Sequence, residues 1–448
     1  MLRSNSIKCT IIVLAAAAWF GLTRTAVAQR EPFSGRNLDG YYSAPDATYA
    51  DISMPAPIKA ADIDRWSCMM GLSEVQVQLF KQFYKEYVER ENDIHDKYVQ
   101  PVWDQSADIS SRRTGVRDVA VAQEFAGLLK RVRPRALQRL VNTEEQVFNE
   151  LAAHLSESQL PMLDRVRKQR QRARSNRRSA RYPGGDIDLT MFLYALHKHG
   201  FDTIPSDPAV LDALLAEYDA AVTLLFKRRA QAIVRISGEG TVLLASRLSM
   251  GAVREGSERW TVAKELRAKS KQLNRRLVDL EKRIHDLNVR FVSAVAETLP
   301  DATGRELRRR FRELAYEPVY PDPTDVTHLF EAALAIEPLS SEQRADLEAN
   351  KDVSAAKQLS LCQRMKDRYL DWREFHGIEW GLPPGTLSVY ERDMQKLQEA
   401  RVENAELAVE LLTGILAPEQ FRELEEALSW FQTKLRNHKF FVDRRLGR

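Results

Sequence analysis

Leu72-Ser73-Glu74-Val75-Gln76 has the pattern of a helix start, and three variants of it follow along the chain. A serine at the N-cap accepts a hydrogen bond from an unpaired amide, and a glutamine three residues later bonds back to the N-cap amide. In the last variant alanine cannot cap, but proline suits the first helical position. The variants are Leu155-Ser156-Glu157-Ser158-Gln159, Leu339-Ser340-Ser341-Glu342-Gln343 and Leu416-Ala417-Pro418-Glu419-Gln420.

The spacing of these phrases predicts a repeat. Ile204-Pro205-Ser206-Asp207-Pro208 and Leu299-Pro300-Asp301 are two further helix starts, so six starts fall at 72, 155, 204, 299, 339 and 416. Long gaps of 83, 95 and 77 residues alternate with short gaps of 49 and 40. A three-fold repeat of one helical hairpin produces this alternation.

Other landmarks keep the same rhythm. An aspartate followed by an apolar residue precedes each unit, at Asp62-Ile63, Asp186-Ile187 and Asp325-Val326. The expected hairpin tips are 103–115, 237–256 and 376–384. We therefore predict a signal peptide over 1–28, an extended segment over 29–57, repeat units over 58–180, 181–319 and 320–440, and a basic tail over 441–448.

The apolar residues recur with helical spacing. The outgoing helix of the first unit and the return helix of the second place their large apolar residues three or four positions apart, which indicates amphipathic, coiled-coil-like helices. Helices of roughly thirty residues would be about 45 Å long. The expected fold is all-α and elongated, with about three tandem long-helical-hairpin units. The two stripes are Val77, Phe80, Tyr84, Val88, Ile94, Tyr98, Val102 and Leu273, Leu277, Leu280, Ile284, Leu287, Phe291, Val295.

The first residues predict export. Arg3 and Lys8 precede an apolar stretch over 10–22, and Ala26-Val27-Ala28 has the small-x-small pattern of a signal-peptidase site. An uncleaved anchor is the alternative, because Arg24 lies between the apolar stretch and the cleavage site. We expect a periplasmic or extracellular protein that begins at Gln29 and has no transmembrane helix.

Charge and cysteine content limit the function classes. The 67 basic and 63 acidic residues become 64 and 63 without residues 1–28, a formal net charge of +1. Such a balanced, densely charged chain suits long solvated helices. Cys68 and Cys362 remain after processing. They either form one disulfide in an oxidising compartment or are two free buried thiols.

The four phrases at 72, 155, 339 and 416 resemble the LTxxQ motif of small exported bacterial helical proteins. That group contains the Spy and CpxP type of periplasmic chaperones and stress adaptors, and related envelope metal sensors. Here serine or alanine replaces the threonine in every copy. The resemblance implies a non-enzymatic envelope role in which a helical surface binds unfolded or partner proteins.

A run of basic residues over 165–181 (RVRKQRQRARSNRRSAR) is the first candidate site. It contains no acidic residue, so it is a candidate for binding nucleic acid, an acidic polysaccharide or lipid headgroups. The alternative is a solvated helix end that leads into a linker. The candidate anion-binding residues are Arg165, Arg167, Lys168, Arg170, Arg172, Arg174, Arg177, Arg178 and Arg181.

The hairpin tips are the second candidate site, because they carry large apolar residues. Exposed apolar patches often mark partner sites; the alternative is that each tip folds back onto its own hairpin or a neighbouring unit. The candidate partner-binding residues are Trp103, Trp260, Phe375 and Trp380.

Patterns of catalysis and metal binding are weak. The Glu-x-x-x-His pairs Glu91–His95, Glu150–His154 and Glu281–His285 are interpreted as surface contacts one helical turn apart. His197 and His199 are two residues apart and point to different sides of a helix. The glycines of Ser237-Gly238-Glu239-Gly240-Thr241 are typical of a turn, because no phosphate-loop ending follows.

These observations favour a non-catalytic exported protein with no cofactor that binds proteins as a scaffold, adaptor or chaperone-like factor. The alternative is a binder of anionic envelope polymers or lipids through the arginine-rich segments. An enzyme on an unfamiliar helical scaffold is the third hypothesis.

Overall fold

The computed structural model describes residues 57–102, 104, 119–175, 180–198, 208–250, 258–320, 322–378, 386–433 and 435. Within these ranges the regular structure is α-helical, apart from one short π-helix, and no strand occurs. The prediction of an all-α fold is confirmed for this part of the chain. The predicted signal peptide over 1–28 lies outside the described residues.

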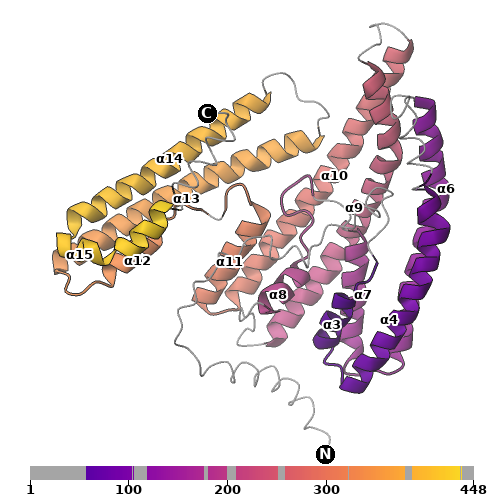
Figure 1. Cartoon of the computed structure of the whole chain (residues 1–448), viewed down its shortest axis with the longest axis horizontal. Coiled ribbons are helices and arrows are strands. Elements are labelled where there is room, and N and C mark those ends of the chain that lie inside the picture. Colours follow the sequence, from indigo (N-terminus) through magenta and orange to yellow (C-terminus); the bar gives the residue numbers. More distant parts are fainter. Residues whose placement is uncertain are drawn as a thin grey trace, which may run out of the picture. The chain divides into compact units, whose positions relative to one another are not determined.

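The order short, long, long, short occurs three times among the helices (Figure 1). The π-helix η2 (His95–Val99) extends the second helix of the first set, and residues 425–433 are also helical after the last helix. The first set is α3 (Ala60–Met69), α4 (Glu74–Ile94), α6 (Val119–Ala152) and α7 (Leu160–Ser175). The second is α8 (Leu189–Lys198), α9 (Pro208–Met250), α10 (Glu258–Glu297) and α11 (Asp301–Ala315), and the third is α12 (Thr327–Leu334), α13 (Ser341–Ile378), α14 (Thr386–Ile415) and α15 (Pro418–Glu423).

The chain divides into two compact units. The first comprises Met1–Ser179, Thr190–Gly200 and Leu215–Leu266, and the second comprises Ala180–Leu189, Phe201–Leu214 and Arg267–Arg448. The division passes through α9 and α10. The segment predicted as the middle repeat unit, 181–319, therefore contributes residues to both.

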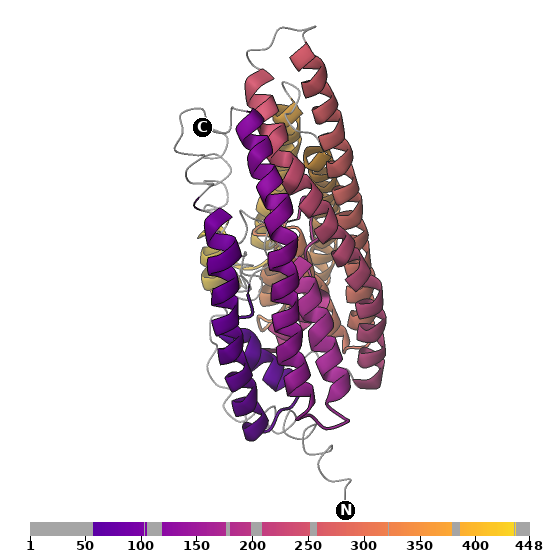
Figure 2. The ribbon, with the colours of Figure 1, turned by 90° about the vertical axis from the view of Figure 1, so that its right-hand side faces the viewer.

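In the first compact unit, α4 packs along α6, and the two helices lie side by side in Figure 2. Phe80, Phe148 and Trp66 are almost completely buried between α3, α4 and α6, and the rings of Trp66 and Phe148 meet edge to face at 5.6 Å. The apolar stripe predicted for the outgoing helix of the first unit faces this core. Phe80, Ile94 and Val102 are buried, and Tyr84, Val88 and Tyr98 are partly buried against the core.

In the second compact unit, α13 and α14 run side by side, and α12 and α15 lie at the end opposite to their connection (Figure 1). Phe330, Leu412 and Phe431 are buried there in one apolar cluster. On α10, the predicted seam is confirmed for its core: five of its residues are buried, and Leu280 and Leu287 are half-buried. The five are Leu273, Leu277, Ile284, Phe291 and Val295.

One predicted tip is wrong in its extent. The segment 237–241, with its two glycines, lies inside α9, which continues to Met250. A glycine in a helix costs only about 1 kcal/mol relative to alanine. The helix-favouring residues on both sides outweigh this local preference for a turn.

The predicted helix starts are mostly confirmed. Helix α4 begins after Ser73, α13 begins after Ser340, and Pro418 is the first residue of α15. Helices α9 and α11 begin at Pro208 and Asp301. The exception is α7, which begins at Leu160 because residues 157–159 form a turn.

The glutamines of these phrases pair with one another across the fold. Gln76 and Gln159 each accept the amide proton of their own cap residue, and each donates its side-chain amide to the other at 3.1 and 3.3 Å. Gln76 Nε2 also donates to the carbonyl of His154 at 2.8 Å, and Gln159 Nε2 to that of Gly71 at 3.2 Å. We call this reciprocal pair a glutamine clasp.

A second glutamine clasp joins Gln343 and Gln420. Their side-chain amides exchange hydrogen bonds at 2.9 and 3.4 Å, and each oxygen accepts its own cap amide. Gln343 donates to the Ile415 carbonyl at 2.9 Å, and Gln420 to the Pro338 carbonyl at 2.6 Å. Each clasp therefore holds the start of an outgoing helix beside the start of a terminal helix.

Replacing Gln343 tests the second clasp. Gln343→Ala should lower the free energy of unfolding by about 1–2 kcal/mol, because a cap and a cross-helix hydrogen bond are lost together. Urea denaturation followed by circular dichroism measures the change. Gln363→Ala is the matched control, since Gln363 is exposed on the same helix and bonds only to Asp367 one turn away.

A double variant separates pairing from capping. If the glutamines are coupled, Gln343→Ala with Gln420→Ala should cost less than the sum of the two single changes. Strict additivity would contradict the clasp.

Candidate functional site

The centre of the arginine-rich segment faces the interior of the first compact unit. Glu144 on α6 is completely buried and forms ion pairs with Arg170 and Arg174 of α7, at 2.6 Å for the Nε of Arg174. Arg174 also contacts Glu145 at 3.0 Å. Burial lowers the pKa of Arg170, but the adjoining Glu144 carboxylate outweighs it and raises the pKa above its usual value.

Arg172 joins three helices through a second buried ion pair. Its guanidinium is 1% exposed and lies 2.6 Å from the carboxylate of Asp219 on α9. It also donates to the hydroxyls of Thr190 on α8 and Thr223 on α9, at 3.0 and 3.1 Å. Arg165 approaches the other oxygen of Asp219 at 3.7 Å.

These contacts change the interpretation of three members of the arginine-rich segment. Arg170, Arg172 and Arg174 are not available to an external anion, because buried carboxylates already neutralise them, and they do not form a solvated helix end. Of the other described members, Arg167 donates to Asn149, Arg181 donates to the Gly377 carbonyl, and Lys168 is exposed. Arg177 and Arg178 lie outside the described residues.

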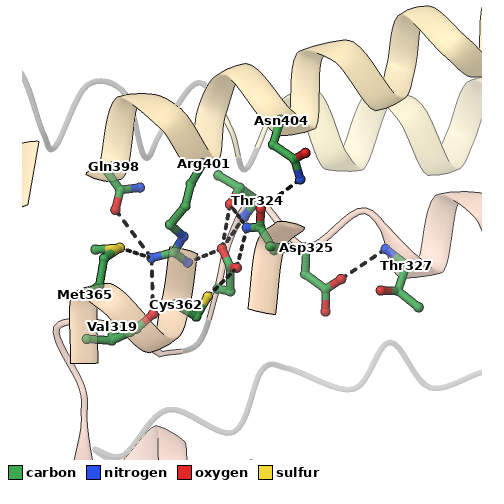
Figure 3. Close-up of polar contacts among 11 residues, drawn as sticks. Val319, Thr324, Asp325, Thr327, Cys362, Met365, Gln398, Arg401 and Asn404 are labelled. Atoms are coloured by element: carbon green, nitrogen blue, oxygen red, sulfur yellow. Dashed lines mark hydrogen bonds and ion pairs between the residues drawn. The ribbon is translucent and has the colours of Figure 1, made fainter. Parts of the chain in front are cut away.

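A third buried charge lies in the second compact unit (Figure 3). Arg401 of α14 is 1% exposed and forms an ion pair with Asp322, in the segment between α11 and α12. Its Nη1 also contacts the Val319 carbonyl at 3.3 Å and the Met365 sulfur at 3.2 Å. Burial raises the pKa of Asp322, but Arg401 and the surrounding hydrogen bonds hold it below its usual value.

Amide side chains complete this centre. Gln358 of α13 donates to both Asp322 and the Thr324 hydroxyl, and Asn404 of α14 donates to Gln358 at 3.1 Å. Removing one member of a buried ion pair leaves an uncompensated charge and typically costs about 3–5 kcal/mol. The centre therefore fixes the register of α13 against α14.

The two described cysteines, Cys68 and Cys362, are free thiols. Cys68 is exposed on α3, so the prediction of burial is wrong for it, and Cys362 is buried on α13. The Cys362 thiol donates to Asp322 at 3.2 Å. Burial, together with the neighbouring Asp322 carboxylate, raises the pKa of Cys362 to about 12.

Helix α10 holds the segment Ala180–Leu189, which we call the strap, through residues on one helical face. The carboxylate of Glu281 is fully buried and accepts the backbone amides of Arg181 and Tyr182 at 2.7 and 3.0 Å. Two turns further along, Asn288 donates to the carbonyls of Gly184 and Ile187 at 3.1 and 2.9 Å. The strap is thus fixed to α10 by its backbone.

His285 lies between these two residues on α10. It is 5% exposed, and its Nε2 is 3.1 Å from the hydroxyl of Tyr316. The rings of Tyr182 and Tyr316 meet the imidazole edge to face at 5.4 and 5.6 Å. Glu281 and His285 are both buried, so the interpretation of this pair as a surface contact is wrong.

The other histidine pairs are arranged differently. Glu91 is buried, while His95 contacts Asp96 at 3.3 Å; His154 is exposed and stacks on Phe83. His197 is exposed, and His199 lies outside the described residues. Among the residues that the structure describes, no group of three or more His, Cys, Asp or Glu is placed to hold a metal ion.

The third helix of each set, α6, α10 and α14, carries a completely or almost completely buried charged residue: Glu144, Glu281 or Arg401. Glu144, Glu281 and Arg401 precede the leucine that follows their helix, Leu155, Leu299 and Leu416, by 11, 18 and 15 residues. These distances differ by steps of three and four residues, so the three positions share one helical face. The sequence shows the spacing, but not which residues compensate the charges.

The third hairpin exposes aromatic and aliphatic side chains at the tip end of α13 and α14. Trp372 and Tyr390 are half-buried and stack on each other with ring centroids 4.6 Å apart. Phe375, Leu387 and Val389 are 36%, 44% and 47% exposed. We call these five residues the tip patch. Trp103 and Trp380 lie outside the described residues, as does the side chain of Trp260 in α10.

The tip end of α13 is anchored to α10 and the strap. Besides the bond from Arg181, the Gly377–Ile378 turn receives the side-chain amide of Asn274 at 3.4 Å, and Glu374 pairs with Lys282 at 2.8 Å. A Cβ atom at Gly377 would come within 2.7 Å of Val278. The end of α13 therefore packs on α10 and the strap, while Phe375 remains exposed; the rest of the predicted tip, 379–384, lies outside the described residues.

Comparison with known proteins adds no relative. No protein-family model, no curated protein and no solved structure matches the chain. None of the described helices has an apolar stretch long enough to cross a lipid bilayer.

The reactivity of the thiols tests the Asp322 centre. At pH 8, a chromogenic disulfide reagent should modify Cys68 rapidly and Cys362 only after unfolding, because with a pKa of about 12 only on the order of one thiol in ten thousand is ionised. Absorbance of the released thiolate measures both rates.

Cys68→Ser is the control and should abolish the fast phase. Both proteins carry Cys9→Ser, so that any chain that keeps residues 1–28 adds no third thiol to the reaction. Rapid modification of Cys362 in the native protein would contradict the buried centre.

Proposed function

We propose that this protein is a non-catalytic exported helical protein that binds other proteins, as a scaffold, adaptor or chaperone-like factor. The tip patch is the observation that carries the proposal. Aromatic residues are enriched at the centres of protein interfaces because each buries a large apolar area at a small entropic cost. Trp372, Phe375 and Tyr390 have this composition at one end of a hairpin.

The buried charges support a structural scaffold. Arg170, Arg172 and Arg401 meet carboxylates inside the fold, so their charges stabilise packing instead of facing a ligand. The same contacts weaken the alternative of an anion-binding surface over 165–181. The four LTxxQ-like phrases and the predicted signal peptide agree with an envelope protein that works through helical surfaces.

We also propose that the three hairpins are copies of one unit, arranged as an elongated array. The repeated order of short and long helices supports this, as does the buried charge on each return helix. The aspartate landmarks behave alike: Asp62, Asp186 and Asp325 each accept a backbone amide at 2.9–3.0 Å. Their apolar neighbours Ile63, Ile187 and Val326 are all buried.

Charged substitutions in the tip patch test the binding role. Phe375→Asp with Val389→Glu should weaken the suppression of aggregation of a denatured reporter protein roughly tenfold, because two partly exposed apolar contacts worth about 0.7 kcal/mol each are lost. Light scattering after dilution from denaturant measures the effect.

The matched control is Val353→Asp with Leu359→Glu, which alters two exposed apolar residues on α13 away from the tip. It should retain full suppression, and circular dichroism should show that both variants are folded. Equal suppression by the two variants would reject the tip patch as the binding surface.

Export has its own test. Edman sequencing of the protein recovered from the periplasm or medium of an expressing bacterium should begin at Gln29. A chain that retains Arg3 and sediments with membranes would instead indicate an uncleaved anchor.

A further inference from the structure

We propose that His285 is an acid-sensitive latch for the strap: adding a proton to its imidazole releases Ala180–Leu189 from α10. The proposal concerns a conformational device and does not depend on the tip patch. It starts from the line of Glu281, His285 and Asn288 on α10, in which the outer two residues hold the strap by its backbone.

The contact between His285 and Tyr316 suits a neutral imidazole. Since a tyrosine hydroxyl is a good donor, we assign the proton of the 3.1 Å contact to Tyr316, which makes Nε2 the acceptor. A protonated imidazole would carry a hydrogen on Nε2. The Tyr316 hydroxyl would then have to turn and find another acceptor in a buried site, where an unsatisfied donor is costly.

The strap packs closely against the imidazole. Gly184 has a φ of +68°, and a Cβ atom there would be 3.2 Å from the Nδ1 of His285. Nδ1 makes no hydrogen bond with a described residue, and the nearby Pro183 backbone raises the pKa of His285 by less than burial lowers it. The closed strap thus covers one ring nitrogen and Tyr316 covers the other, which leaves the added charge without water.

Charged groups around the site act in both directions. On α10, Asp286 favours the protonated form, and Lys282 opposes it; on α13, Lys366 opposes it, with its ammonium 5.3 Å from the Tyr316 ring. Glu281 accepts hydrogen bonds from the strap amides, and Glu374 forms an ion pair with Lys282. Tyr182 and Tyr316 are neutral at physiological pH. Burial dominates this balance and lowers the pKa of His285 below 6.5.

The sign of the pH response follows from linkage. The released strap leaves His285 with its ordinary pKa of 6.5, so the open form binds the proton more readily than the closed form. The closed form is favoured fully above pH 6.5 and loses its advantage as the pH falls towards the folded pKa. At pH 5.5 the opening equilibrium can rise by at most about tenfold over its value at pH 7.5.

Release of the strap would also loosen α13. The Ala180 carbonyl accepts a hydrogen bond from Arg373 at 2.6 Å, and Arg181 donates to Gly377 at 2.9 Å. Both bonds end in the last turns of α13. Acid therefore acts on the strap first and on this helix end second.

Hydrogen exchange of the full mature chain tests the latch. Peptides spanning 180–189 should lose protection by about three- to tenfold between pH 7.5 and 5.5, after correction for the intrinsic exchange rate. This pH range lies above the ordinary titration of carboxylates. His285→Gln keeps a polar acceptor but does not titrate, so its strap should keep the same protection at both pH values.

His154→Gln is the matched control, because it removes an exposed histidine and should leave the acid response intact. If His285→Gln does not fold, an NMR titration of the His285 imidazole in the natural chain tests the same mechanism: its midpoint should lie below 6.5 and coincide with the loss of strap protection. Equal strap protection of the natural chain at both pH values would overturn the proposal. So would an acid response that persists in His285→Gln, or a His285 midpoint at or above 6.5.

Discussion

A charged side chain inside a protein must be compensated, and this requirement organises the described part of the chain. Glu144, Glu281 and Arg401 lie on the buried faces of the three return helices. Each is compensated by groups from outside its hairpin: the arginines of α7, the backbone amides of the strap, and Asp322 ahead of α12. Leaving one of these charges uncompensated would cost several kcal/mol of folding free energy. The positions of α7, the strap and the Asp322 segment are therefore fixed by the charges that they compensate. Apolar packing alone tolerates more alternatives.

Local chemistry explains which features could be predicted from the sequence. Caps and prolines act within one turn, so the starts of α4, α9, α11, α13 and α15 could be predicted. The role of the arginines could not, because their partners Glu144 and Asp219 come from other helices. The glutamine clasps have one trace in the sequence. Gln420 is present in the fourth phrase although Ala417 stands there in place of the capping serine. A residue kept without its capping partner serves a second contact.

The glycines over 237–241 show the limit of local chemistry: their turn preference predicts a hairpin tip, but the rest of α9 decides the structure. His285 is a third feature that the sequence alone does not predict correctly. Its spacing from Glu281 is common on exposed helices, and only burial reveals that both residues face the strap. The candidate site thus depends on which helix faces meet, and this is information that periodicity alone does not contain.

The glutamine clasps have a property that the ion pairs lack. An amide has no charge to lose or to screen, so its hydrogen bonds are indifferent to acidity and to salt over the whole range in which the backbone itself survives. The helix starts joined by Gln76 with Gln159 and by Gln343 with Gln420 would stay joined in brine or in acid. If the proposed export takes place, the surroundings are not held at a fixed pH, and these helix starts would stay joined there while the strap and the end of α13 respond to acid.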